Sequence, residues 1–162
     1  MTDASKLHES QVVLGCFAVE GEVYALDVHL VREVIRWQPV TPLPMAPTLI
    51  EGVIDVRGAV IPVVDLGRAL RGACLEPGPS TRIVISEVDG LVLGLTVDAA
   101  VEVLAVDPSA LDDPPALAIQ AGYDAARAVV RRPDGAPTLV LSLDHLLESV
   151  YRSALRAEEA VA

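Results

Sequence analysis

Short runs of apolar and β-branched residues, separated by glycine-bearing polar turns, make up most of this chain. Residues 12–28 form two such runs around a turn at residues 20–22, a pattern that predicts a β-hairpin. Residues 50–65 form two more runs that meet at Arg57 and Gly58. β-branched side chains fit the pleated surface of a sheet better than a helix. The pattern therefore predicts a mostly β protein.

Two segments depart from the strand pattern. Asp65 precedes residues 66–71 and is placed to cap a short helix there, which Gly72 would end. Apolar residues between 142 and 158 recur at spacings of three and four, which predicts an amphipathic C-terminal helix over residues 142–158. We expect this helix to pack against the strands. Residues 1–11 are expected to form an N-terminal tail.

The strand pattern occurs twice along the chain. Residues 21–35 match residues 90–104 at an offset of 69, with six of 15 positions identical. Residues 57–70 match residues 134–147 at an offset of 77, with five of 14 identical. Two matching blocks in the same order favour an internal duplication. We therefore expect two small, similar β units that share an apolar interface, since neither unit alone would bury enough surface.

Composition and charge narrow the classes of function. The 162 residues are 52% hydrophobic but only 3% aromatic, so the core must be aliphatic. A formal net charge of −11 disfavours nucleic acid and anionic membrane surfaces as partners. No run is long and apolar enough to span a bilayer, and no signal-peptide pattern is present at the N-terminus. We expect a cytoplasmic protein whose Cys16 and Cys74 are reduced.

The search for catalytic or metal-binding motifs yields little. None of the three histidines lies at ligand spacing from another histidine or a cysteine, so no metal site or cofactor is predicted. Phosphate-binding, dinucleotide-binding and serine-nucleophile motifs do not occur. The alternative is a small hydrolytic enzyme that uses Asp55, Asp65 and Asp98. That alternative requires the three carboxylates to share a cleft.

Two charged residues interrupt apolar strands in the first half. Residues 31–37 are rich enough in β-branched residues to predict a further strand, which contains Glu33, and Arg57 lies at the junction of the two runs within residues 50–65. Charges in such places are costly unless they are paired. The counterparts in the second half are Glu102 and Asp134, so an ion pair is available only in the first half. The pair is interpreted either as a structural salt bridge that orders the junction or as a surface presented to a partner, and both can hold.

Four stretches in this order carry a family resemblance: FAVEGEVYALDVHLVREVI, IEGVIDVRGAVIPVVDL, GLTVDAAVEVL and LVLSLDHLL. Together they resemble the CheW-type coupling domain of bacterial chemotaxis systems, as a single domain over residues 12–147. The resemblance implies an all-β fold of two five-stranded SH3-like β-barrels on a shared core, plus the C-terminal helix. The first barrel would cover about residues 12–75 and the second about residues 80–147, with exchange of strands between them left open.

The same resemblance implies a non-catalytic signalling adaptor. Such a domain couples the cytoplasmic tips of methyl-accepting chemoreceptors to the regulatory domain of a CheA-type histidine kinase, without entering the membrane. The alternative within the same family is a CheW-like scaffold of a motility or second-messenger chemosensory system. The resemblance places partner binding on the first barrel and in the groove between barrels. The residues that it assigns to partner binding are Glu33, Arg57, Val31, Ile83, Gly94, Ala100 and Val103.

Two positions depart from the family pattern. Asp55 stands where the pattern has Asn, and Glu51 stands where a basic residue is common. Both changes are expected to make the surface of the first barrel more acidic, which bears on the choice of partner.

Overall fold

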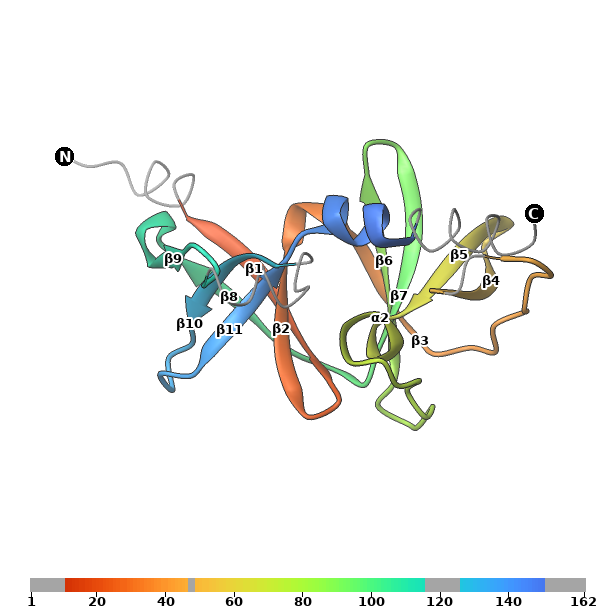
Figure 1. Ribbon diagram of the computed structural model, residues 1–162, viewed down its shortest axis with the longest axis horizontal. Coiled ribbons are helices and arrows are strands. Elements are labelled where there is room, and N and C mark those ends of the chain that lie inside the picture. The colour runs from red at the N-terminus through yellow and green to blue at the C-terminus, as the bar shows by residue number, and fades with distance from the viewer. Residues whose placement is uncertain (1–10, 47–48, 116–125, 151–162) are drawn as a thin grey trace.

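The computed structural model describes residues 11–46, 49–115 and 126–150, and most of them lie in two β-sheets (Figure 1). The five-stranded sheet has the order β3-β6-β7-β5-β4, and the six-stranded sheet has the order β8-β1-β2-β11-β10-β9. Each sheet forms an SH3-like barrel, called barrel 1 (five strands) and barrel 2 (six strands) below. The expected all-β, two-barrel fold is confirmed, except that barrel 2 has six strands where five were expected.

Barrel 1 contains β3 (Val31–Arg36), β4 (Ile50–Val56), β5 (Ala59–Asp65), β6 (Arg82–Val88) and β7 (Leu91–Val97). Barrel 2 contains β1 (Val12–Val19), β2 (Glu22–Asp27), β8 (Ala99–Val106), β9 (Leu111–Asp112), β10 (Ala126–Arg131) and β11 (Pro137–Leu141). The helical elements are η1 (Val28–Leu30), α2 (Leu66–Arg71), η2 (Pro108–Ala110) and a helix over residues 143–150.

Strand registers confirm the predicted duplication. In barrel 1, Val34 on β3 lies opposite Val84 on β6. Adding the offset of 69 to Val34, and removing it from Val84, gives Val103 and Gly15, which lie opposite each other on β8 and β1. The parallel pair of Val63 on β5 with Gly94 on β7 corresponds to that of Val140 on β11 with Ala25 on β2, with an offset of 77 for the first residue and 69 for the second. The two barrels are therefore related by an approximate internal twofold repeat.

The barrels do not follow the expected ranges 12–75 and 80–147. The chain builds β1 and β2 in barrel 2, then all of barrel 1 as the continuous stretch 31–97, and returns to barrel 2 with β8. The boundary expected at residues 76–80 instead lies inside barrel 1, between α2 and β6. Only Asp98 separates β7 from β8, which is too short for a hairpin turn, so β8 must continue into the other sheet. The exchange of strands that the sequence left open is therefore present: the two halves of the chain exchange hairpins between the sheets.

Three apolar clusters make up the core. One lies inside barrel 1 and one inside barrel 2. The largest lies between the barrels and combines side chains from both sheets, such as Leu26 and Leu95, each fully buried. The helix at residues 143–150 packs into this shared cluster through Leu143, Leu146 and Val150, between the two sheets in Figure 1.

Burial of an aliphatic interface of this kind stabilises the two barrels as one body. The expected packing of the C-terminal helix is confirmed over residues 143–150. Residues 151–158 of that predicted helix, and residues 1–10 of the predicted tail, lie outside the described residues.

Candidate functional site

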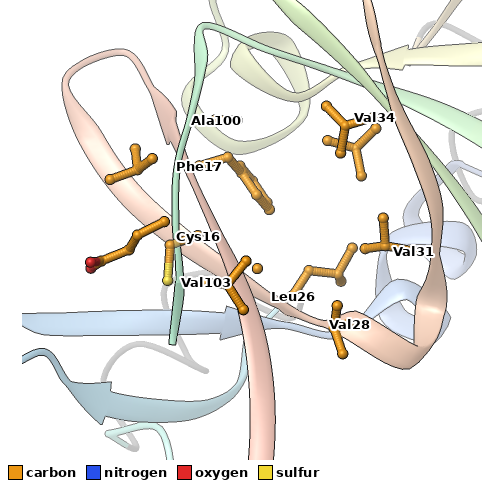
Figure 2. Close-up of a pocket in the computed structure, with 12 residues that line it drawn as sticks. Cys16, Phe17, Leu26, Val28, Val31, Val34, Ala100 and Val103 are labelled. Carbon is orange, nitrogen blue, oxygen red and sulfur yellow. The ribbon is translucent and has the colours of Figure 1, made fainter. Parts of the chain in front are cut away.

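An apolar groove with a volume of about 270 Å³ opens between the two barrels. Its walls come from β1, β2, η1 and β8 on one side and from β3 and β6 on the other. Figure 2 shows Phe17, Leu26, Val31, Val34 and Val103 gathered around this space. The lining residues are Gly15, Cys16, Phe17, Leu26, Val28, Val31, Val34, Val84, Ala100, Val101, Glu102 and Val103.

The groove leaves large apolar side chains open to solvent. Val103 is 70% exposed, Val34 48% and Val101 46%. They lie on β8 and β3, which are edge strands of the two sheets. Glu102 is the one charged residue in the lining, and within the described stretches it has no ion-pair partner. An exposed apolar patch with a charged edge is typical of a protein-binding surface.

The structure places three of the five expected groove residues in this groove, namely Val31, Ala100 and Val103. Ile83 and Gly94 do not line it, which corrects that part of the expectation. Ile83 is fully buried inside barrel 1, and a Cβ added to Gly94 would lie 2.8 Å from its Cγ2 atom. Successive residues of a strand face opposite sides, so Val84 faces the groove where Ile83 cannot.

Several residues that line the groove were not predicted from the sequence. Val34 had a usable signal, because it is the counterpart of Val103 at the offset of 69. Gly15 and Phe17 had none, since nothing local shows that β1 joins the edge strand β8.

The predicted ion pair between Glu33 and Arg57 is present. Arg57 Nη2 lies 2.6 Å from each carboxylate oxygen of Glu33. The Arg57 side chain is 74% exposed and the Glu33 side chain 30%. Because β3 and β4 are the two edges of the barrel 1 sheet, this pair joins those edges and helps to close the barrel. Gln38 Nε2 donates to the carbonyl oxygen of Asp55 at 3.1 Å and adds a second link.

The local sequence explains how Arg57 is presented. Arg57 and Gly58 are the two central residues of the β4–β5 turn, with φ values of 50° and 86°. A two-residue hairpin turn with both φ values positive matches the twist of the strands and favours glycine at its second position. Asp55 Oδ1 accepts a hydrogen bond from Gly58 N at 2.8 Å. Asp55 therefore fixes the turn that carries Arg57 rather than lying free on the surface.

The three carboxylates of the enzyme alternative do not share a cleft. Asp65 is 4% exposed and accepts from Arg68 N at the start of α2 and from Leu75 N. Asp98 Oδ2 accepts from Glu20 N at 2.7 Å. Asp55 lies at the turn end of the β4–β5 hairpin, five residues along the ladder from Asp65, which corresponds to roughly 17 Å. Each carboxylate satisfies a main-chain donor at a different place.

Two groups have perturbed pKa values. Burial, and then the negative charge of Asp65, raise the pKa of Glu51, while Arg68 opposes that change. Glu51 Oε2 is buried without a hydrogen-bond partner. Burial, followed by the charge of Glu102, raises the pKa of the Cys16 thiol. Both changes follow from desolvation of the charged form.

Within residues 11–46, 49–115 and 126–150, no group of three or more His, Cys, Asp or Glu side chains is arranged to hold a metal ion. Nor does any helix in these ranges have the length and apolar character that a membrane crossing requires.

The two linked barrels, with an apolar groove between their edge strands and an exposed ion pair on barrel 1, define a protein-binding domain. The family model of the CheW-like domain matches residues 14–151, and the chain belongs to this family. It is 34% identical over 155 residues to the chemotaxis protein CheW of Rhizobium meliloti (strain 1021), covering 95% of this chain and 99% of that protein. It is 36% identical over 115 residues to the chemotaxis protein CheW of Bacillus subtilis (strain 168), covering 71% and 72%.

Among solved structures, the scaffolding protein TtCheW from Thermoanaerobacter tengcongensis matches with a TM-score of 0.75 and 30% sequence identity. The match covers 83% of this chain and 86% of that one. The two-barrel architecture is therefore shared with a crystal structure of the same family.

Proposed function

We propose that this chain is a non-catalytic cytoplasmic adaptor that couples methyl-accepting chemoreceptors to the regulatory domain of a CheA-type histidine kinase. Membership of the CheW-like family supports this function. The observation that carries it is the apolar groove between the edge strands of two barrels that share one core. An adaptor needs two binding surfaces held in a fixed relation, and a shared core provides that rigidity.

The groove is the proposed site for the receptor tip. A helix binds such a groove through apolar side chains spaced three and four residues apart. Val34 and Val103 provide exposed apolar contacts on the two walls. Burying them against a helix would remove apolar surface from water, which favours association.

Barrel 1 is the proposed surface for the kinase regulatory domain. The Glu33–Arg57 pair lies at one end of this barrel, with the guanidinium largely exposed. Charges at the edge of an interface orient the partner and increase the association rate more than they increase affinity. We therefore assign the pair two roles, closing the barrel and orienting the kinase.

Adaptor function needs no catalytic residue, and the geometry supports this. Asp55, Asp65 and Asp98, the candidates for hydrolytic chemistry, each accept main-chain hydrogen bonds at separate sites. Carboxylates used in this way are held as structural acceptors rather than as an acid–base pair in a cleft.

The test compares two valine-to-glutamate variants that differ in position. Val103→Glu places a charge in the groove, whereas Val60→Glu changes a valine of similar exposure, 67%, on β5 outside it. Binding of a receptor-tip fragment is measured by titration calorimetry, because burying a carboxylate without a partner costs about 1–3 kcal/mol or more. We expect Val103→Glu to weaken receptor binding at least about tenfold. Val60→Glu should leave it unchanged.

Two results would overturn the proposal. If the unmodified protein binds neither the receptor fragment nor the kinase regulatory domain, the adaptor function is wrong. If both valine variants weaken receptor binding equally, the groove is not the receptor site.

A further inference from the structure

At one position in the wall of the groove the internal repeat replaces a side chain with none. In barrel 1 a row of side chains crosses three neighbouring strands: Val34, Val84 and Leu95. The row related by the offset of 69 crosses β8, β1 and β2: Val103, Gly15 and Leu26. Two of the three positions are alike in the two rows. At the middle position, Gly15 stands where barrel 1 has Val84.

No steric reason requires a glycine at this position. A Cβ added to Gly15 would have only the carbonyl oxygen of Leu26 within 4 Å, at 3.9 Å, which is ordinary contact. The backbone of Gly15 is not in the left-handed region that glycine favours. Glycine inside a strand weakens it and often marks a place where another chain approaches closely. The missing side chain therefore leaves space that this chain does not fill.

The space beside Gly15 is apolar and forms part of a groove that is large enough for a partner side chain. Its neighbours in the same row, Val103 and Leu26, both line the groove. A cavity of about 150 Å³ lined by aliphatic side chains is large enough to hold benzene. The groove, at about 270 Å³, exceeds that volume. One branched aliphatic or aromatic side chain of a bound partner would fit.

We propose that Gly15 determines specificity, because it creates a hollow on the barrel 2 side of the groove that receives one apolar side chain of the receptor tip. The inference rests on the proposed adaptor function and deepens it. Other differences between the walls, such as Val31 against Ala100, exchange one side chain for another, whereas Gly15 lacks a side chain altogether. The hollow therefore distinguishes the barrel 2 wall and fixes the direction in which a helix binds.

Charge specifies the occupant further. Glu102 is exposed in the lining of the groove and has no ion-pair partner within the described residues. The whole chain carries a formal net charge of −11. The complementary segment is therefore a helix that presents an apolar side chain to the groove and also carries Lys or Arg, because opposite charges across an interface favour association.

The experiment fills the hollow stepwise with Gly15→Ala, Gly15→Val and Gly15→Leu. Gly15→Val restores the row found in barrel 1. We expect affinity for the receptor-tip fragment to fall progressively along the series, at least about tenfold for Gly15→Val. The thermal midpoint should not fall, because valine suits a strand better than glycine. Binding of the kinase regulatory domain should remain unchanged in all three variants.

Gly78→Val is the matched control. Gly78 also has open space around its added Cβ, has no left-handed backbone and lies outside the groove. This variant should bind the receptor fragment with unchanged affinity.

The possible failures are distinguishable. If the unmodified protein does not bind the receptor fragment, the proposed function itself is wrong. If the unmodified protein binds, but Gly15→Val binds equally well or more tightly, the hollow receives no side chain and the inference alone is overturned. Nuclear magnetic resonance of the unmodified protein gives a test that needs no variant. Addition of the receptor fragment should shift the amide signals of Gly15 and Val103, and unshifted signals would also overturn the inference.

Discussion

Reversing the charge of Arg57 tests whether the ion pair of barrel 1 acts in stability, in binding or in both. In the structure Arg57 Nη2 contacts both carboxylate oxygens of Glu33 at 2.6 Å, with the arginine 74% and the glutamate 30% exposed. Arg57→Glu removes this attraction and places a second carboxylate beside the first. The turn itself should persist, because Gly58 and its hydrogen bond to Asp55 are unchanged.

The loss of stability should be modest because water screens an exposed pair. Such pairs contribute at most about 1 kcal/mol. Two like charges about 4 Å apart in a water-like environment repel by about 1 kcal/mol more. The expected destabilisation is therefore about 1–2 kcal/mol, which lowers the thermal midpoint by about 2–8 °C in a domain of this size. With a typical stability of at least about 5 kcal/mol, the variant remains almost entirely folded.

Binding should change more than folding. We expect Arg57→Glu to weaken binding of the kinase regulatory domain at least about fivefold at low salt. The effect should be smaller at high salt, because salt screens the interaction between charges. Circular dichroism measures the thermal midpoint, and titration calorimetry measures binding at two salt concentrations. The swap Glu33→Arg with Arg57→Glu should restore the midpoint but not the binding, since the partner then meets the opposite charges. Unchanged affinity for both kinase and receptor in Arg57→Glu would refute the assignment of barrel 1.

Three further predictions follow from single residues. Asp65→Ala should destabilise the fold by about 2–4 kcal/mol in urea denaturation, because it removes the cap of α2 and leaves the Leu75 N–H without an acceptor. Asp65→Asn, which keeps one acceptor oxygen, should destabilise the fold less than Asp65→Ala does. Burial and Asp65 raise the pKa of Glu51 above 4.5, so the folded state holds a proton that the unfolded state has already lost, and stability falls as pH rises through that window. Glu51→Gln should therefore raise the thermal midpoint at pH 7, and the gain should disappear below about pH 4.5; a gain that persists there would contradict this reasoning. Cys16 is buried with a raised pKa whereas Cys74 is exposed, so iodoacetamide at pH 8 should label Cys74 first, as mass spectrometry would show.

Local signals in the sequence predicted local structure well. The Asp65 cap and the Gly72 stop bracket the observed helix Leu66–Arg71, with Gly72 in the left-handed conformation at φ 75°. The hairpin turn at Arg57 and Gly58 and the pairing of Arg57 with Glu33 were also predicted. These features depend on residues close in sequence or on a charge that needs a partner, so a single chain reveals them.

The sequence could not predict which side chains of an apolar strand point into the barrel and which point into the groove. β6 is apolar at four of its seven positions, among them Ile83, Val84 and Ile85 in a continuous run. Without alternation of polar and apolar residues, nothing in the sequence shows that Val84 faces the groove and Ile83 the interior. Gly94 lies in a similar apolar run on β7.

An irregularity in the backbone explains why Glu51 is not placed as the sequence predicted. The β4–β5 ladder shifts register between Ile50 and Gly52, and Glu51 lies at this bulge. A bulge changes the direction of a side chain relative to its strand. Glu51 is therefore partly buried next to Asp65 instead of adding to an acidic surface, which the linear pattern does not show.

The nesting of barrel 1 between β2 and β8 has a consequence for how the protein is made. During translation, barrel 1 has all its strands once residue 97 has left the ribosome, so its sheet can form while the rest of the chain is still being synthesised, but the core shared between the barrels is completed only later. β1 and β2, which are synthesised before barrel 1, must wait for β8 and β11, because a lone hairpin is marginally stable in water. These two strands are thus made before barrel 1 but are among the last to reach their final place, and they are the apolar strands that a ribosome-bound chaperone would need to shield.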